Sequence, residues 1–95
     1  MLTSKQRALL RGFANDIETI LQIGKSGITE MVCMQADTAL SARELIKIKI
    51  LENAPLTPRE ASDELAKRVD ADVVQVIGTK AILFRKNKKD SNFDI

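Results

Sequence analysis

One short segment near the middle of the chain shows the clearest pattern, because apolar and charged side chains alternate along it. Ile46, Ile48 and Ile50 fall on one side of an extended backbone, and Lys47 and Lys49 fall on the other. This period of two predicts a β-strand with one buried face and one face in water.

Three other segments place apolar residues three and four positions apart, which is the spacing of one helix face. Each begins at a hydroxyl residue that can cap a helix, and the third begins with a capping box that has proline at its first helical position. The predicted helices run from Thr3 or Ser4 to about Phe13, from Thr29 to about Ala42, and from Thr57 to about Val69. The predicted strands are 19–23, 45–51, 72–77 and 81–85, and the last two are joined by a turn at 78–80.

The order of these elements is helix, strand, helix, strand, helix, strand, strand (α-β-α-β-α-β-β). Strands that alternate with helices form crossovers, and the last two strands form a hairpin. We therefore predict an α/β fold: a two-layer domain with a mixed four-stranded sheet and, because one sheet face carries lysines, helices on one face only. The domain is expected to span residues 1–85, followed by a basic-to-polar flexible tail at 86–95.

The residue types in the chain exclude most kinds of catalytic site. There is no histidine and only one cysteine, Cys33, so the usual zinc sites and the Cys-His nucleophile pair are excluded. Asp63 and Glu64 are neighbours on a predicted helix and do not converge on one face. We therefore expect no enzyme activity, no cofactor, no metal and no small-molecule substrate.

The cysteine content and the apolar runs also bear on the cellular setting. A single cysteine cannot form an internal disulfide, which suits a reducing compartment. The sequence contains no signal-peptide pattern and no apolar run near the ~18 residues that a membrane span requires. We expect a cytoplasmic monomer with no membrane contact.

The net charge of +2 is small, but the charges are unevenly distributed. Six acidic and three basic residues lie between positions 52 and 72, whereas five basic and two acidic residues lie between position 80 and the end. A polarised surface of this kind suits a polyanion partner, although a solvated basic tail would give the same pattern.

A glycine-bounded loop, Gly24-Lys25-Ser26-Gly27, joins a predicted strand to a predicted helix. The glycines permit a sharp turn and a close approach by another chain. The amide groups of the following helix favour an anion, and Lys25 adds a positive charge at the tip. The GXXG loop of KH domains clamps a nucleic-acid backbone in this way.

Two other interpretations of this loop are available. It can be an ordinary tight turn in which the glycines serve geometry alone. It also resembles the end of a P-loop, but that motif requires glycine five residues before Gly24, where this chain has Thr19. We therefore exclude nucleotide hydrolysis and retain phosphate-backbone binding.

Basic residues elsewhere can extend such a site. Lys47 and Lys49 can face RNA from the open side of the sheet, or simply solubilise it. Arg85 and Lys86 begin a basic run that can contact phosphates or form a flexible end. Arg11, one helical turn after an arginine at position 7, can add a further patch or belong to a solvated helix face.

Four segments together resemble the CRM-domain family, whose bacterial stand-alone members are the YhbY-type ribosome assembly proteins. The resemblance covers residues 2–85, and one departure is Asn15-Asp16, where many relatives have His-Pro. The segments that carry it are Leu10-Arg11-Gly12-Phe13-Ala14, Ile23-Gly24-Lys25-Ser26-Gly27-Ile28-Thr29-Glu30, Glu44-Leu45-Ile46-Lys47-Ile48-Lys49, and Val76-Ile77-Gly78 followed by Leu83-Phe84-Arg85.

The resemblance implies a fold like the C-terminal domain of translation initiation factor three. It also implies that the chain binds RNA through the GXXG loop and neighbouring basic residues, and that it associates with precursors of the large ribosomal subunit. The RNA-binding residues expected from the sequence and the resemblance together are Gly24, Lys25, Ser26, Gly27, Lys47, Lys49, Arg85, Lys86 and Arg11.

The first hypothesis is therefore an RNA-binding protein that associates with ribosomal RNA of large-subunit precursors and assists ribosome assembly. The alternative is a protein-interaction module of the ribosome or of the RNA-processing machinery that makes no direct RNA contact. Binding that weakens steeply with salt favours the first hypothesis, and salt-tolerant binding favours the second.

Overall fold

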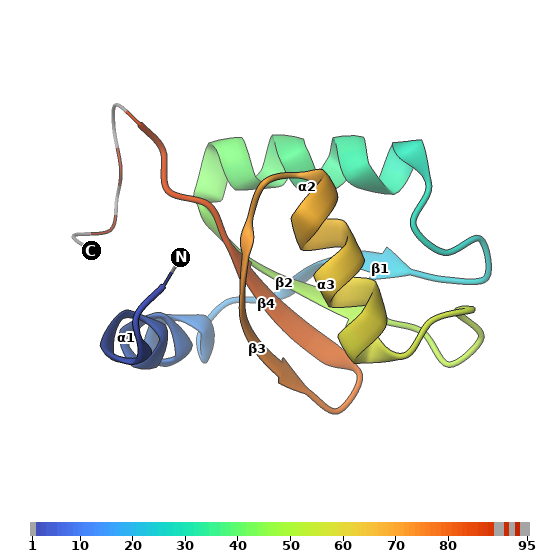
Figure 1. The fold of residues 1–95 in the computed structure, drawn as a ribbon, viewed down its shortest axis with the longest axis horizontal. Coiled ribbons are helices and arrows are strands. Elements are labelled where there is room, and N and C mark those ends of the chain that lie inside the picture. Colours follow the sequence, from blue (N-terminus) through green and yellow to red (C-terminus); the bar gives the residue numbers. More distant parts are fainter. Residues whose placement is uncertain (1, 89–90, 92, 94–95) are drawn as a thin grey trace.

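The computed structural model describes residues 2–88, 91 and 93, and its helices and strands follow the predicted order. Strand β4 begins at Lys80, which sequence analysis had placed in a turn. The elements, drawn in Figure 1, are α1 (Ser4–Ala14), β1 (Thr19–Ile23), α2 (Glu30–Arg43), β2 (Leu45–Ile50), α3 (Pro58–Arg68), β3 (Asp72–Ile77) and β4 (Lys80–Phe84).

Each helix begins at a threonine that caps it. The hydroxyl oxygens of Thr3, Thr29 and Thr57 each accept a hydrogen bond, at 3.1 Å, from the backbone N–H three residues later. In α1 and α3 the side-chain oxygens of Gln6 and Glu60 accept a hydrogen bond from the backbone N–H of the capping threonine, which completes two capping boxes. These bonds satisfy amides that the helix itself leaves unpaired, so the sequence sets where each helix starts.

The sheet has the strand order β1-β2-β4-β3, with β1 parallel to β2 and the other two pairs antiparallel. The prediction of a mixed four-stranded sheet is therefore confirmed. The crossover from β1 to β2 runs through α2, and α3 connects β2 to β3. The two central strands, β2 and β4, pair from Leu45 opposite Phe84 to Lys49 opposite Lys80.

Helices α2 and α3 cover one face of this sheet. Helix α2 lies over β1 and β2, and α3 lies over β3 and β4. The main core lies between these helices and the sheet. Its buried residues include Leu21 and Ile23 of β1, Ile46, Ile48 and Ile50 of β2, Ala81 and Leu83 of β4, Ala36 and Leu40 of α2, and Ala61 and Leu65 of α3.

The prediction that helices cover only one face is wrong for α1, which lies apart from α2 and α3 in Figure 1. Helix α1 packs on the opposite face of the sheet and forms a second core there. The alternating lysines of β2 indicate a solvated surface only where they themselves lie, and the rest of that sheet face is apolar. The buried residues of this second core are Leu10 and Ala14 of α1 with Leu45, Val74, Ile82 and Phe84 of the sheet.

A β-bulge interrupts the pairing of β3 with β4. Val73 lies opposite Leu83, but the next paired residue is Gln75, opposite Ile82, so Val74 is the extra residue. Val74 belongs to the core beneath α1, and Gln75 lies opposite a residue of the same core. The bulge therefore places two consecutive side chains on the α1 face, where strict alternation would allow one.

Glu44 connects α2 to β2 with a positive φ of 66°, and its side chain is completely buried. Its Oε2 accepts hydrogen bonds from the backbone N–H of Asn87, at 3.0 Å, and from the hydroxyl of Ser91, at 2.6 Å. Its backbone carbonyl accepts a bond from the N–H of Arg85, at 2.9 Å. A buried carboxylate thus ties the segment after β4 to the start of β2.

The ring of Phe93 packs edge-on against Phe13, with ring centroids 5.4 Å apart, and against Phe84, at 5.5 Å. Sequence analysis placed residues 86–95 in a flexible tail, whereas Asn87, Ser91 and Phe93 contact the domain. Positions 89, 90, 92, 94 and 95 lie outside the described residues. The domain boundary at residue 85 stays a prediction.

We predict that replacing Leu10 with alanine lowers the free energy of unfolding by about 2–5 kcal/mol, because this side chain is 0% exposed beneath α1. Urea unfolding followed by circular dichroism measures the change. The control is Leu9→Ala on the same helix, where the side chain is 50% exposed and the expected change is below about 0.5 kcal/mol. Equal effects of the two substitutions would contradict the packing of α1 on this face.

Candidate nucleic-acid interface

The loop from Gly24 to Gly27 is a tight turn closed by a hydrogen bond from the N–H of Gly27 to the carbonyl of Gly24, at 2.9 Å. Gly27 is buried and has a φ of +70°. A Cβ atom at Gly27 would lie 3.1 Å from Cγ of Pro55, and one at Gly24 would lie 3.4 Å from Leu51. The positive φ and the close approach of Pro55 therefore both require glycine at position 27, independently of any binding function of the turn.

Lys25 and Ser26 are the exposed residues at the tip of this turn. The helix that follows has one first-turn amide, that of Val32, already bonded to the Thr29 hydroxyl, and it carries the acidic Glu30 in its first turn. The predicted positive pole of α2 is therefore partly satisfied within the protein. Lys25 is the full positive charge that the loop itself presents.

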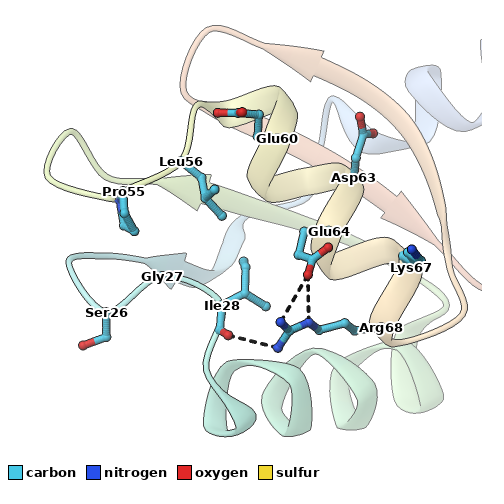
Figure 2. A pocket seen from close by; sticks show the side chains of 10 residues that line it. All are labelled: Ser26, Gly27, Ile28, Pro55, Leu56, Glu60, Asp63, Glu64, Lys67 and Arg68. Carbon is cyan, nitrogen blue, oxygen red and sulfur yellow. Dashed lines mark hydrogen bonds and ion pairs between the residues drawn. The ribbon is translucent and has the colours of Figure 1, made fainter.

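A groove of about 640 Å³ lies on one side of the loop, between the turn and helix α3 (Figure 2). Ile28, Pro55 and Leu56 supply apolar surface, and the α3 wall carries charged side chains. Figure 2 shows the Arg68 guanidinium between the Glu64 carboxylate and the carbonyl of Ile28, to which it donates at 3.2 Å.

The α3 wall of this groove carries charges of both signs: the carboxylates of Glu60, Asp63 and Glu64, the ammonium group of Lys67 and the guanidinium of Arg68. Hydrogen bonds from the backbone and side chain of Thr57 lower the pKa of Glu60. Asp63 is paired with Arg59 at 3.2 Å, and Glu64 is paired with Arg68 at 3.1 Å. A phosphate chain would therefore meet carboxylates as well as cations on the α3 side of the loop.

The face of the sheet that α2 and α3 leave uncovered carries further basic residues. Lys47 and Lys49 of β2 project there, as predicted from their alternation. Lys80 of β4 is the direct cross-strand partner of Lys49, so two ammonium groups lie on neighbouring strands of the same face. Like charges in this position repel, and an anion between them would relieve the repulsion.

Arg11 of α1 joins these lysines, because it lines a hollow together with Lys47 and Lys80. We call Arg11, Lys47, Lys49 and Lys80 the open-face basic patch. Sequence analysis found three of its members and missed Lys80, which it assigned to the hairpin turn. Alternation along β4 could have identified Lys80, because a strand that begins one residue earlier than predicted places residues 80, 82 and 84 on the same face.

The GXXG loop lies at the same end of the sheet as Lys49 and Lys80. Ile23, the residue before the loop, pairs with Ile50, and the N–H of Leu51 donates to the carbonyl of Ile23 at 2.8 Å. The N–H of Ile50 in turn donates to the carbonyl of Thr79, in the β3–β4 turn. The loop and the patch are therefore neighbours at one edge of the molecule.

Arg85, in contrast, is not part of this arrangement. Its guanidinium forms an ion pair with Asp37 at 2.7 Å and donates to the hydroxyl of Ser41 and to the carbonyls of Asp37 and Val69. The structure thus gives Arg85 a structural role, linking the end of β4 to α2 and to the end of α3, that sequence analysis did not foresee. Lys86 is exposed one residue further on and lies at the same end of β4, away from Lys80.

Two features are absent from the described part of the chain. No helix there is both long and apolar enough to cross a bilayer. No cluster of three or more histidine, cysteine or acidic side chains there is arranged to hold a metal ion.

Comparison with known proteins finds relatives that are named as probable RNA-binding proteins. The chain is 34% identical to the Bacillus subtilis protein named Probable RNA-binding protein YqeI, over all of this chain and 99% of that one. It is 33% identical to Probable RNA-binding protein PA4753 of Pseudomonas aeruginosa, over 93% of this chain and 85% of that one.

A solved structure has the same fold. The solution structure of the Staphylococcus aureus protein SAV1595, described as a hypothetical protein and candidate RNA-binding protein, superposes with a TM-score of 0.85. The two sequences are 38% identical, over 100% of this chain and 99% of the other. Residues 2–85 match the CRS1 / YhbY (CRM) domain. The chain belongs to the CRS1/YhbY (CRM) domain family.

Proposed function

We propose that this protein binds RNA through the open-face basic patch and the adjoining GXXG loop. The observation that carries the proposal is the direct pairing of Lys49 with Lys80 on the sheet face opposite α2 and α3. Arg11 and Lys47 extend this charge along the sheet, and Lys25 extends it to the loop. A row of cations in a fixed geometry suits the regularly spaced phosphates of a nucleic-acid backbone.

The approach of the RNA follows from the two sides of the loop. On the α3 side a phosphate would meet carboxylates beside Lys67 and Arg68, whereas on the sheet face it would meet only the cations Lys49 and Lys80. The RNA backbone therefore crosses the open face of the sheet and reaches the turn from that side. In this arrangement Lys25 binds one phosphate at the tip, and the glycines hold the turn in place.

Ribosomal RNA of large-subunit precursors is the RNA we propose, and assistance in ribosome assembly is the role. The names of the relatives support RNA binding, and the resemblance to YhbY-type assembly proteins supports the ribosomal target. The described residues contain no catalytic constellation of the usual histidine or metal type. The proposed action is binding without a chemical step.

A second candidate function rests on a different surface. Met31 and Met34 of α2 are 64% and 65% exposed and line a shallow groove with Ile20 of β1. Exposed apolar groups of this kind are typical of protein-binding surfaces. The alternative is therefore a protein-interaction module that joins an RNA–protein assembly through this groove, without direct RNA contact.

Replacing Lys49 with alanine should weaken binding to a labelled large-subunit ribosomal RNA transcript and reduce the salt dependence of that binding. Each lost phosphate contact lowers the slope of log K against log salt by about 0.7–0.9. Titrations between roughly 50 and 200 mM salt measure both quantities. Lys67→Ala, in the α3 groove, is the matched control and should leave the slope unchanged. Equal slopes for both variants and the parent protein would remove Lys49 from the interface.

Reversing the charge at the loop tip tests the loop separately. Lys25→Asp combined with Ser26→Asp should reduce affinity for the same transcript by about tenfold or more. The reason is that the ammonium group proposed to bind a phosphate is lost and two carboxylates that repel phosphate are introduced. Both positions are exposed, so the fold should survive, whereas substitution of Gly27 would strain the turn itself. The neutral pair Lys25→Gln and Ser26→Asn controls for shape and should retain more affinity. Undiminished binding by the aspartate variant would contradict the role of the loop.

Sedimentation of a lysate distinguishes the ribosomal proposal from the protein-interaction alternative. We expect the tagged protein to travel with large-subunit precursors in a sucrose gradient, and to be released by ribonuclease or by high salt. If the tagged protein stays in the fractions of unbound protein at the top of the gradient under all conditions, the ribosomal target is contradicted. Retention on a protein partner after ribonuclease treatment, abolished by Met34→Asp, would instead support the alternative.

A further inference from the structure

A small hollow lies where α1 meets the open face of the sheet. Arg11, Lys47 and Lys80 supply its positive charges, and Asn15 and Gln75 supply two side-chain amides. These residues come from α1 and its end, β2, β4 and β3, so the hollow is built by four separate segments. The polar side chains that line the hollow belong to neither hydrophobic core.

The remaining walls of the hollow are apolar. Ala14 and Ile82 are buried beneath its polar rim, at 3% and 5% exposure, whereas Ile77 is 61% exposed at its edge. Flipped nucleic-acid bases are commonly held between flat or apolar side chains of this type.

The size of the hollow limits what it can hold. Its volume is about 120 Å³, which is room for about four water molecules at ~30 Å³ each. That space suits one heterocyclic ring system and is too small for a whole nucleotide. A base could enter while its sugar and phosphate stay outside, next to the ammonium groups of Lys47 and Lys80.

The β-bulge in β3 explains why a polar side chain faces this hollow. Val74 takes the core position beneath α1, and the bulge allows Gln75 to occupy the same face immediately after it. Bulges often serve to direct a side chain into a functional site. Without the extra residue, alternation would direct position 75 towards the core beneath α3.

The chemistry of the lining favours a base that is rich in acceptors. The guanidinium, two ammonium groups and two amide NH2 groups are all donors, and only the two amide carbonyls accept. Guanine presents two adjacent acceptors, O6 and N7, and arginine or lysine paired with these atoms is the commonest base-specific contact.

We propose that this hollow is a base-binding site that takes one unstacked guanine of the bound RNA. Arg11 donates to O6 and N7, and Lys47 and Lys80 bind the adjoining phosphate. Gln75 and Asn15 pair with the remaining polar edge, and Ile77 covers one face of the ring. This inference rests on the proposed RNA-binding function and adds to it a sequence preference at one nucleotide.

The four ribonucleoside 5′-monophosphates test the site directly in the intact protein. They share one phosphate and sugar, so differences among them report the base alone. In titrations followed by ¹⁵N-correlated NMR, we expect GMP to shift the side-chain NH2 signals of Asn15 and Gln75 at lower concentration than UMP, CMP or AMP. Indistinguishable shifts for all four nucleotides, or shifts confined to residues outside the hollow, would overturn the base site.

Short oligonucleotides test the same site with a substitution. An octauridylate with one central guanosine should bind about tenfold more tightly than octauridylate itself. Gln75→Leu should remove most of that difference and leave the salt slope unchanged. Gln22→Leu is the matched control, since Gln22 lies opposite Lys49 on the same face but outside the hollow, and it should keep the preference.

The outcomes separate this inference from the function on which it rests. If both oligonucleotides bind equally well and Lys49→Ala still weakens both, the base site is wrong and RNA binding stands. If neither oligonucleotide nor ribosomal RNA binds at low salt, the proposed function is wrong and the base site falls with it. The NMR titration of the parent protein decides the matter even if Gln75→Leu fails to fold.

Discussion

The alternation of side chains along β2 is the constraint on which the rest of the structure depends. This strand is central, paired with β1 on one side and β4 on the other, so each of its side chains is committed to one of two faces. Ile46, Ile48 and Ile50 take the face that α2 and α3 cover. Lys47 and Lys49 are thereby held on the other face, where a shift of pairing by one residue would bury two charges. The stability of the core and the position of the cations are therefore set by one register.

That register also explains how a weak loop motif can be part of a site. Gly24 to Gly27 form a turn whose closing glycine is demanded by a positive φ and by Pro55, so the glycines alone give no evidence of RNA binding. The position of the loop is more informative, because β1 ends beside the end of β2 that carries Lys49. On its other side the loop faces charges of both signs on α3. The sheet thus supplies the charge that the turn lacks, whereas α3, whose charges balance, adds none.

Features set by short-range pattern were predicted from the sequence, and features set by contacts between distant segments were not. Thr3, Thr29 and Thr57 mark the helix starts, and the element order and the mixed sheet followed from local periodicity. The placement of α1 was wrong, because Leu45 and Val74 form its core only after the strands have paired. Arg85 was taken for a surface cation because its partners, Asp37 and Ser41, lie more than forty residues away. The direction of Gln75 depends on a bulge, which no local pattern in the sequence indicated.

The small net charge of the chain conceals an uneven distribution of charge. Helix α3 carries three acidic and three basic residues, while Lys47, Lys49, Lys80 and Arg11 lie on the face that α3 does not touch. A uniformly basic protein of this size would attract a polyanion from every side. In the proposed binding mode the cations of the sheet face attract an approaching backbone, whereas α3, whose charges balance, offers no net attraction. Orientation of this kind favours the entry of one base into the proposed site beside α1, because it brings the phosphates of that nucleotide onto the neighbouring lysines.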